Sequence, residues 1–229
     1  MNFDQSEYFK AIDQTWPAAK YIENDNWLFR EGRGGGKRVS AASALNANAS
    51  VEVALKQFND FNKRPLFMLK DGDRAIDEAL AKLDFAIIDP VDVMAIGVDN
   101  SDDDIEKFCH DAPTKIAKEI WAEGGIEKPR LDVMARAKCA KTYLQIDNGA
   151  VAFAAIWNEI AMVHALEVQR SARRQGMGKR MMQIALTWAE GQGARELVVL
   201  TVKANKPAQQ LYRNMGFRDV AHYHYRQAP

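Results

Sequence analysis

The sequence predicts an α/β protein made of two similar halves. Segments with a two-residue hydrophobic period alternate along the chain with segments that show the 3.6-residue period of helices. A strand followed by a helix recurs 132 residues further along. With 229 residues, of which 47% are hydrophobic and 27% charged, the composition is that of a globular chain with one large domain or two small ones.

In the first half, strands and helices are expected to alternate. Ser50 is a good cap for the helix that follows it, and Pro90 is expected to divide the apolar stretch 85–98 into two strands. The expected elements are two strands within 27–45 separated by a glycine run, a helix over 50–64, a strand at 65–69, a helix over about 73–84 and the two strands of 85–98.

Near residue 100 the composition becomes acidic, in the segment DNSDDDIEK. Ser101 followed three residues later by Asp104 is typical of a helix start. We therefore expect a domain boundary here, with one domain over 1–100 and a second over 101–229.

The second half is expected to begin with helices and to continue with a hairpin. Asn148-Gly149 favours the positive backbone angles of a tight turn, and 197–202 is apolar enough for a strand buried on both faces. Further expected elements are helices over 101–109 and 113–125, hairpin strands at 140–146 and 151–157, a strand at 160–168, a helix with a buried face of Met177, Met181, Ile184, Ala185 and Trp188, a helix over 205–217 and a final strand at 220–226.

The repeat is visible as an ungapped alignment of 73–85 with 205–217. It predicts two copies of one fold, although any strand, helix, strand unit would give some similarity. The copies differ where Leu80 stands opposite Tyr212 and Asp84 opposite Gly216.

A cluster of cations and glycines follows the strand at 160–168 and has no counterpart in the first half. Amides at a helix N-terminus favour anions, and arginine side chains bind phosphate oxygens with two hydrogen bonds, so this segment is expected to hold a diphosphate rather than to be only a solvated cationic face. It matches neither the dinucleotide fingerprint nor the Walker pattern. Another glycine-rich segment, 32–38, is expected to be a flexible hairpin tip, with an anion or substrate loop as the alternative. The candidate anion-binding residues are Arg173, Arg174, Gln175, Gly176, Met177, Gly178 and Lys179.

The pattern R-x-x-G-x-G at 173–178, together with Asn205, Ala208, Leu211, Tyr212, Gly216 and Phe217, resembles the GNAT superfamily of acyl-CoA-dependent N-acyltransferases. The resemblance covers about 101–229, and the first half resembles the degenerate copy of tandem members. It implies a mixed, mostly antiparallel central sheet flanked by helices. It also implies that the cationic segment binds the pyrophosphate of coenzyme A, that the strand at Leu166 and Val168 pairs with the pantetheine arm, and that Asn205 and Ala208 contribute to the same site.

The implied reaction is direct attack of an amine on acetyl-CoA, with acetyl-CoA as co-substrate and no metal. The amine must lose a proton and the leaving thiolate must gain one. Tyr212 matches the family tyrosine that protonates the leaving sulfur. A phenol with a pKa near 10 is a competent donor to a thiolate.

The general base is left open. Strand alternation places His164 on one face with Leu166 and Val168, and similar histidines act as the base in the serotonin N-acetyltransferase branch. A satisfied core histidine is the alternative for His164. Glu167, on the other strand face, Glu159, at the hairpin turn, and water relays are the other candidates.

Composition restricts the remaining classes of function. Lys plus Arg and Asp plus Glu both number 31, so nucleic-acid binding lacks its basic footprint, and no apolar stretch is long enough to span a membrane. A cytoplasmic protein is expected, with Cys109 and Cys139 reduced and structural, and with His222 and His224 on a strand surface rather than on a metal. The acceptor amine and the oligomeric state stay open, and a silent acyl-CoA sensor or interaction module is the alternative function.

Overall fold

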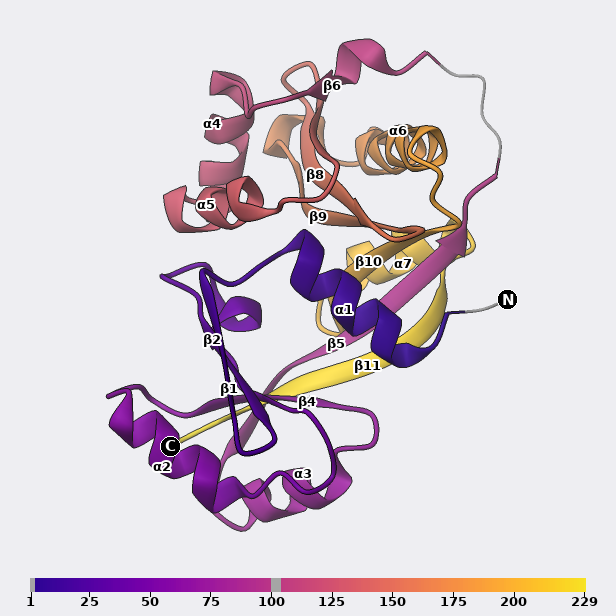
Figure 1. Cartoon of the computed structure of the whole chain (residues 1–229). Coiled ribbons are helices and arrows are strands. Elements are labelled where there is room, and N and C mark those ends of the chain that lie inside the picture. The colour runs from indigo at the N-terminus through magenta and orange to yellow at the C-terminus, as the bar shows by residue number, and fades with distance from the viewer. Residues whose placement is uncertain (1–2, 100–103) are drawn as a thin grey trace.

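The structure, a computed structural model, describes residues 3–99 and 104–229 and places them around one long, twisted sheet (Figure 1). In the first half the elements are α1 (Gln5–Thr15), β1 (Lys20–Asn24), β2 (Trp27–Glu31), the 3₁₀ turn η1 (Lys37–Val39), β3 (Ser43–Ala44), α2 (Val51–Asp60), β4 (Leu66–Lys70), α3 (Arg74–Ala81) and β5 (Ala86–Gly97). In the second half they are η2 (Glu106–Phe108), β6 (Cys109–His110), α4 (Lys115–Glu123), α5 (Lys128–Arg136), β7 (Lys141–Ile146), β8 (Ala150–Trp157), β9 (Ile160–Val168), η3 (Arg170–Ala172), α6 (Met177–Gly191), β10 (Glu196–Val202), α7 (Lys206–Asn214) and β11 (Arg218–Gln227).

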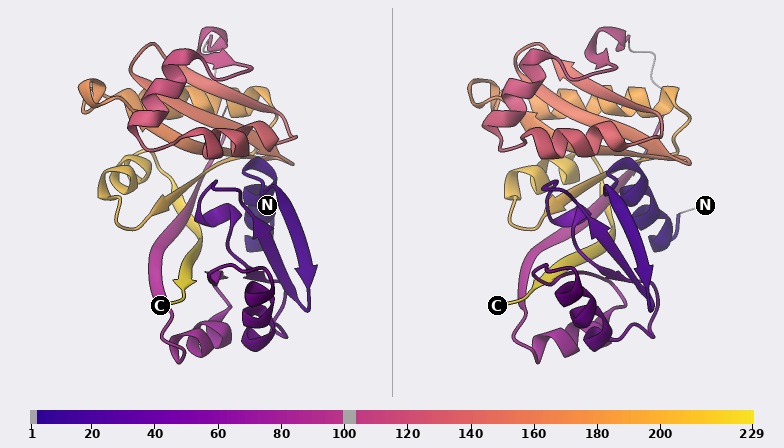
Figure 2. Two further views of the ribbon diagram at one scale, coloured as in Figure 1. Left: turned by 90° about the vertical axis from the view of Figure 1, so that its left-hand side faces the viewer. Right: turned by 60° about the vertical axis from the view of Figure 1, so that its left-hand side comes forward.

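The large sheet has eight strands in the order β4-β11-β5-β10-β9-β8-β7-β6, and a small sheet has the order β1-β2-β3. Among the named strands of the described residues, only β9 and β10 pair in parallel. Helix α6 covers one face of β7 to β10, whereas α1, α4 and α5 pack on the other (Figure 2). The expected mixed, mostly antiparallel sheet flanked by helices is confirmed.

The two halves exchange their last strands. Strand β5 lies between β11 and β10, and β11 lies between β4 and β5, so each half completes the sheet of the other (Figure 1). Helices α3 and α7 begin at Arg74 and Lys206, and β5 and β11 begin at Ala86 and Arg218, so both pairs are separated by 132 residues. The aligned segments therefore form the same elements. The large sheet contains strands from both halves. The division into domains 1–100 and 101–229 stays a prediction.

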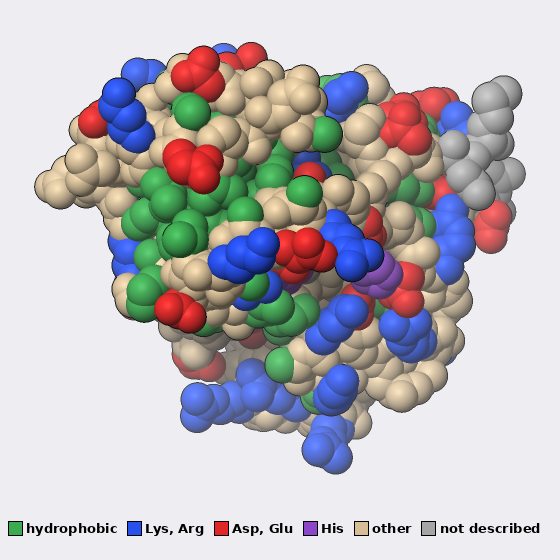
Figure 3. Space-filling view, turned by 90° about the horizontal axis from the view of Figure 1, so that it is seen from below, with side chains coloured by type: hydrophobic (Ala, Val, Ile, Leu, Met, Phe, Trp, Pro, Cys, Tyr) green, Lys and Arg blue, Asp and Glu red, His purple; other side chains and the backbone are tan. Residues whose placement is uncertain are grey.

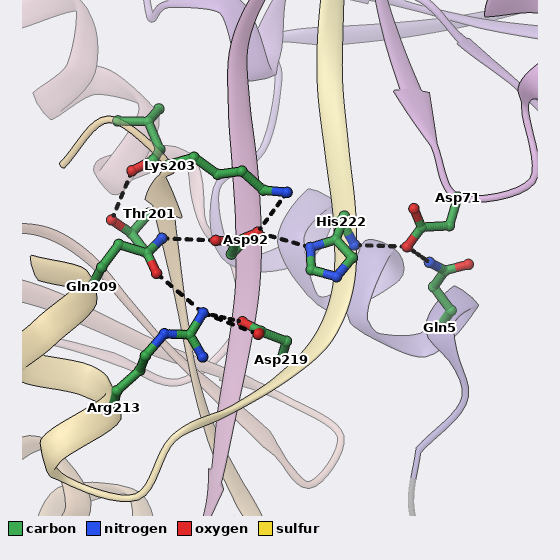
Figure 4. A network of polar contacts seen from close by, with 10 residues as sticks. Gln5, Asp71, Asp92, Thr201, Lys203, Gln209, Arg213, Asp219 and His222 are labelled. Carbon is green, nitrogen blue, oxygen red and sulfur yellow. Dashed lines mark hydrogen bonds and ion pairs between the residues drawn. The ribbon is translucent and has the colours of Figure 1, made fainter. Parts of the chain in front are cut away.

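A buried polar network stabilises the exchange (Figure 4). Asp92 on β5 is 4% exposed, and its carboxylate accepts hydrogen bonds from Gln209 on α7 and His222 on β11, both at 2.8 Å. Burial alone would raise the pKa of Asp92, but these hydrogen bonds and the charge of Lys203, 3.5 Å away, outweigh it and lower the pKa overall. The network therefore joins elements from both halves through a charged carboxylate.

Most elements of the second half lie where the sequence predicts them. Strand β9 has the predicted bounds 160–168, α7 carries Pro207 in its first turn, and Gly216 follows it with a φ of 92°. The predicted buried face of α6 is confirmed, with Met181, Ile184, Ala185 and Trp188 buried and Met177 half-buried.

Other expectations were wrong or fall outside the description. Pro90 does not divide the strand, because it lies at a bulge of the continuous β5, where a missing N–H is tolerated. The described part of 101–109 forms the short η2 and the start of β6 instead of the expected helix, and Ser101 lies outside the described residues. The sequence reading missed α1, β1 and α5.

Seen from below, side chains of both charge signs surround an apolar area, in keeping with the equal numbers of acidic and basic residues (Figure 3).

Within 3–99 and 104–229, no helix combines the length and the apolar character that crossing a membrane requires.

Candidate active site

The parallel pair β9–β10 opens at its carboxyl end. The register runs from Glu196 opposite Ile160 to Val199 opposite Val163, and beyond these residues the two strands no longer pair with each other. Strand β9 continues to Val168 and stays bonded to β8 on its other edge. The edge of β9 that faces β10 can therefore pair with an extended ligand.

A β-bulge lies in β9 at this point. Ala165 has a φ of 52°, unusual for a residue with a side chain, and the β8–β9 register shifts around it. Its carbonyl oxygen accepts a hydrogen bond of 2.7 Å from the indole N–H of Trp121 on α4, which helps to hold this conformation. Strain of this kind, on the order of 1–2 kcal/mol, is typical of functional sites.

The bulge overturns one sequence expectation. Strict alternation predicts His164 on the same face as Leu166 and Val168, but the extra residue reverses the phase of the strand. Leu166 and Val168 pack toward α6, whereas His164 contacts Phe153 and Trp16 on the opposite face.

The cationic segment forms the loop between β9 and α6. Gly176 is the N-cap of α6 with a φ of 79°, and no side chain caps the helix within the described structure, so its first amides are available to a ligand. Arg173 donates from Nε to the carbonyl of Val168 at 3.1 Å, and Arg174 and Lys179 are exposed. Gln175 donates to the carbonyl of Ser171 at 2.9 Å.

The α6 N-terminus packs closely on α7. A Cβ added to Gly178 would lie 3.1 Å from Leu211 Cδ2, so glycine permits this approach. Asn205 caps α7 by accepting a hydrogen bond of 3.2 Å from the amide of Ala208. The predicted coenzyme residues on the two helices are thus neighbours in the structure.

Tyr212, on α7, is 7% exposed and packs its ring 5.5 Å from that of Phe217. Burial, with a contribution from the negative charge of Glu167, raises the pKa of Tyr212 to about 12. The phenol therefore stays protonated at neutral pH and can donate a proton.

Glu167, on β9, lies against the end of α4. A Cβ added to Gly124 would lie 2.6 Å from Glu167 Cδ, so glycine at this position leaves room for the carboxyl group. Burial raises the pKa of Glu167, while the charges of Arg173 and Arg130 partly offset the effect. A carboxylate with a raised pKa beside an open strand pair is a candidate general base.

His164 is 4% exposed and has a partner at each ring nitrogen. Arg38 Nη1 lies 3.2 Å from Nδ1, and Thr15 Oγ1 lies 2.9 Å from Nε2. Because a guanidinium can only donate, Nδ1 accepts and the ring proton is assigned to Nε2. The Thr15 hydroxyl donates its hydrogen bond to the carbonyl of Ala11 at 2.7 Å, so its oxygen is free to accept from Nε2, which fits this assignment. Burial, together with the charge of Arg38, lowers the pKa of His164 well below its ordinary value, so the ring is neutral.

A cavity of about 260 Å³ lies between the two halves beside this histidine. Part of its wall is the glycine-rich segment 32–38, which connects β2 to β3 but is not a free hairpin tip: a Cβ added to Gly35 would lie 2.5 Å from Val133 Cγ2 of α5. The sequence reading missed most of the lining, because it comes from seven separate parts of the chain. The lining residues are Trp16, Gly35, Gly36, Lys37, Arg38, Asp89, Val91, Ile126, Arg130, His164, Ala165, Val202, Tyr223 and Tyr225.

The remaining residues that the sequence analysis considered for catalysis or metal binding lie away from this opening or are paired with other side chains. Glu159 lies at the opposite end of β9, 3.1 Å from Arg195. His222 and His224 contact Asp92 and Asp77 at 2.8 and 2.9 Å, and within the described residues no cluster of three or more metal-ligating side chains occurs. Cys109 and Cys139 are free thiols.

Comparisons with known proteins agree with this geometry. Residues 119–217 match the family described as "Acetyltransferase (GNAT) family". Over 60 residues the chain is 38% identical to "N-acetyltransferase family 8 member 3" of Rattus norvegicus, and over 84 residues it is 31% identical to "Streptothricin acetyltransferase" of Streptomyces lavendulae. These stretches cover 26% and 34% of this chain, and 26% and 44% of the relatives, so the chain matches less than half of either relative's length.

Solved structures extend the likeness to both halves. A GCN5-related N-acetyltransferase from Kribbella flavida superposes with a TM-score of 0.70 at 15% identity, covering 100% of this chain and 97% of that one. A tandem GNAT protein from the clavulanic acid biosynthesis pathway gives 0.56 at 12% identity, covering 88% and 77%. At such identities the likeness shows the fold, while the family match is confined to residues 119–217. Residues 119–217 of the chain thus match the GNAT acetyltransferase family, and the chain as a whole shares the fold of GNAT structures.

Proposed function

We propose that the protein transfers an acetyl group from acetyl-CoA to an amine. The observation that carries the proposal is the opening between β9 and β10, which has the uncapped α6 N-terminus on one side and Tyr212 and Glu167 close by. The family match of 119–217 supports acetyl transfer in general.

In this proposal the coenzyme enters at the α6 N-terminus. The first amides of α6 and the exposed side chains of Arg174 and Lys179 bind the pyrophosphate, since a helix N-terminus and guanidinium groups both favour phosphate oxygens. The amides of the pantetheine arm pair with the open edge of β9 along Leu166 and Val168. This arrangement directs the thioester toward the bulge at Ala165.

Glu167 then takes a proton from the acceptor ammonium, and the neutral nitrogen attacks the thioester carbonyl. The new C–N bond forms, the C–S bond breaks, and Tyr212 gives its proton to the departing thiolate. The attacking nitrogen then loses its second proton to the Tyr212 phenolate, which leaves a neutral amide and restores the phenol. The raised pKa of Glu167 suits a base that works near neutral pH, and the raised pKa of Tyr212 keeps its proton in place until the thiolate appears. We assign His164 a positioning role, because both of its ring nitrogens are occupied.

The test has two parts. Coenzyme A is titrated into the protein to measure binding, and amines of several classes are screened for acetylation by measuring the release of free coenzyme A thiol. For Glu167→Gln we expect a fall in kcat of about 10²- to 10⁴-fold with little change in coenzyme affinity. Since burial raises the pKa of Glu167, wild-type kcat/KM should rise with pH through a pKa above the ordinary glutamate value, and the variant should lack that limb.

The matched control is Glu159→Gln, at the exposed far end of the same strand, which should retain wild-type rates. Coenzyme binding without acceleration of thiol release by any amine would favour a silent acyl-CoA sensor. Absence of coenzyme binding would leave only an interaction module.

A further inference from the structure

The cavity beside His164 contains an arginine with one unused edge. The Nη1 group of Arg38 is bound to His164 Nδ1 at 3.2 Å, and its guanidinium lies 5.8 Å from the ring centre of Trp16. Its Nε is shielded from solvent and has no hydrogen-bond partner within the described residues. Buried donors are almost always satisfied, so an unsatisfied one in a cavity wall is available to a hydrogen-bond acceptor that enters the cavity.

A second arginine of the same protein shows what this edge can bind. Arg30 donates from Nε and Nη2 to the two carboxylate oxygens of Asp13 at 2.9 and 2.7 Å, while its Nη1 binds Ser43. Arg38 likewise uses Nη1 for a protein partner, but no described side chain occupies the Nε–Nη2 edge. That edge has the geometry for a two-point hydrogen bond with a carboxylate.

The charges around the cavity also favour an anion. Lys37 is paired with Asp89 at 2.8 Å, so these two charges offset each other. Arg38 and Arg130 form no ion pair with any carboxylate of residues 3–99 and 104–229, but the charge of Arg130 acts on Glu167, so the cavity is left with the uncompensated charge of Arg38. An acceptor that brought only a positive ammonium would meet repulsion here.

The rest of the cavity is apolar and small. Trp16, Tyr223 and Tyr225 supply aromatic surface, and the volume of about 260 Å³ lies just below the usual range for small-molecule sites, which suits a small acceptor. Ala165 of β9 and Val202 of β10 also line it, so it borders the opening where the thioester is expected.

Resting on the proposed function, we propose that the acceptor is a small amine that also carries a carboxylate and an apolar body, as an amino acid does. Arg38, oriented by His164, binds the carboxylate through its Nε–Nη2 edge. Arg130 adds a second positive charge, and the aromatic side chains hold the body.

Binding of the acetylated products tests this without any catalysis. Calorimetry would compare N-acetylphenylalanine with N-acetylphenethylamine, which differ only in the carboxylate. We expect the carboxylate-bearing member to bind wild type at least tenfold more tightly, and Arg38→Gln to remove that preference. Arg33→Gln, at an exposed arginine of the same connection, is the matched control and should keep it.

Equal binding of both products to wild type, or equal weakening of both by Arg38→Gln, would overturn the inference. If Arg38→Gln does not fold, Arg38→Lys keeps the charge without the two-point edge and should lose most of the preference. Coenzyme titration with thiol release tests the proposed function separately. A protein that discriminates the products yet transfers no acetyl group would refute the activity and retain the carboxylate site.

In an active enzyme, a second readout follows. Arg38→Gln should raise KM for phenylalanine at least tenfold and leave KM for phenethylamine within about twofold, with kcat little changed. A uniform loss of kcat for both amines would instead indicate a structural role and contradict the assignment.

Discussion

The two halves of the molecule share a scaffold and differ at one junction. In the first half, α2 begins at Ser50, whose hydroxyl caps the helix by accepting from the amide of Val53 at 3.5 Å. In the second half, α6 occupies the same place in the order of elements, but it begins at Gly176 without a side-chain cap and is preceded by Arg173 and Arg174. The comparison teaches that the halves differ where the proposed coenzyme site begins, at this junction, while the order of the elements that follow it is the same.

The other difference lies on the following helix. Leu80 of α3 is fully buried, whereas the aligned Tyr212 of α7 brings a hydroxyl close enough to Glu167 for that charge to raise its pKa. In our proposal the first half contributes instead to the acceptor side, through Trp16 and the connection that carries Arg38.

The largest effect is expected at Tyr212, whose hydroxyl has no equivalent on the aligned Leu80 of the first half. Tyr212→Phe should lower kcat by about 10²- to 10⁴-fold, because it removes the proton donor to the leaving thiolate. Stopped-flow measurement of thiol release would show this, and calorimetry should find coenzyme affinity nearly unchanged. A variant with wild-type kcat would remove the acid role from Tyr212.

Next in size is the effect of the cationic loop. Arg173→Gln combined with Arg174→Gln should weaken coenzyme binding about tenfold or more, and the wild-type affinity should fall with added salt, since phosphate contacts are screened. The same titration should give one coenzyme per chain, because the junction before α2 has no cations. A stoichiometry of two would mean that the halves are functionally equivalent.

A smaller effect is expected at the capped junction. Ser50→Ala should cost about 1 kcal/mol of unfolding free energy, as the loss of a helix cap usually does. Urea unfolding would measure this, and coenzyme affinity should not change. Altered affinity in this variant would show that the α2 N-terminus takes part in the site.

The smallest effect concerns the turns after α3 and α7. Asp84 and Gly216 are aligned, and both have positive φ, 59° and 92°, so the backbone is the same although the residues differ. Asp84→Gly should stabilise the protein by up to about 1 kcal/mol, and Asp84→Ala should destabilise it, because only glycine adopts this region without strain. Thermal unfolding of the two variants checks the order, and the reverse order would show that the Asp84 side chain stabilises its turn.

Sequence reading succeeds where local signals agree. Periodicity, Pro207 and Gly216 locate α7, and the alternation of apolar residues locates β9. Recurrence 132 residues apart indicates the two halves, but nothing local reveals that β5 and β11 change places, because strand pairing depends on partners far away in sequence.

The candidate site shows the same limit. The glycines and arginines of the proposed coenzyme loop form a recognisable spacing within ten residues. The state of His164, in contrast, depends on Arg38, 126 residues away, and on Thr15, 149 residues away. A bulge at Ala165 also shifts the strand by one residue, which alternation cannot anticipate.

Because β5 pairs with β10 and β11 pairs with β4, each half needs a strand of the other half to complete its part of the sheet. A fragment that began after β5 would leave the edges of β10 and β11 without a neighbour, and bare strand edges promote aggregation. We therefore expect that the second half does not fold as an independent unit, however complete its motifs are. Any shortened version must retain β5, and with it the helix and turn that carry that strand into place.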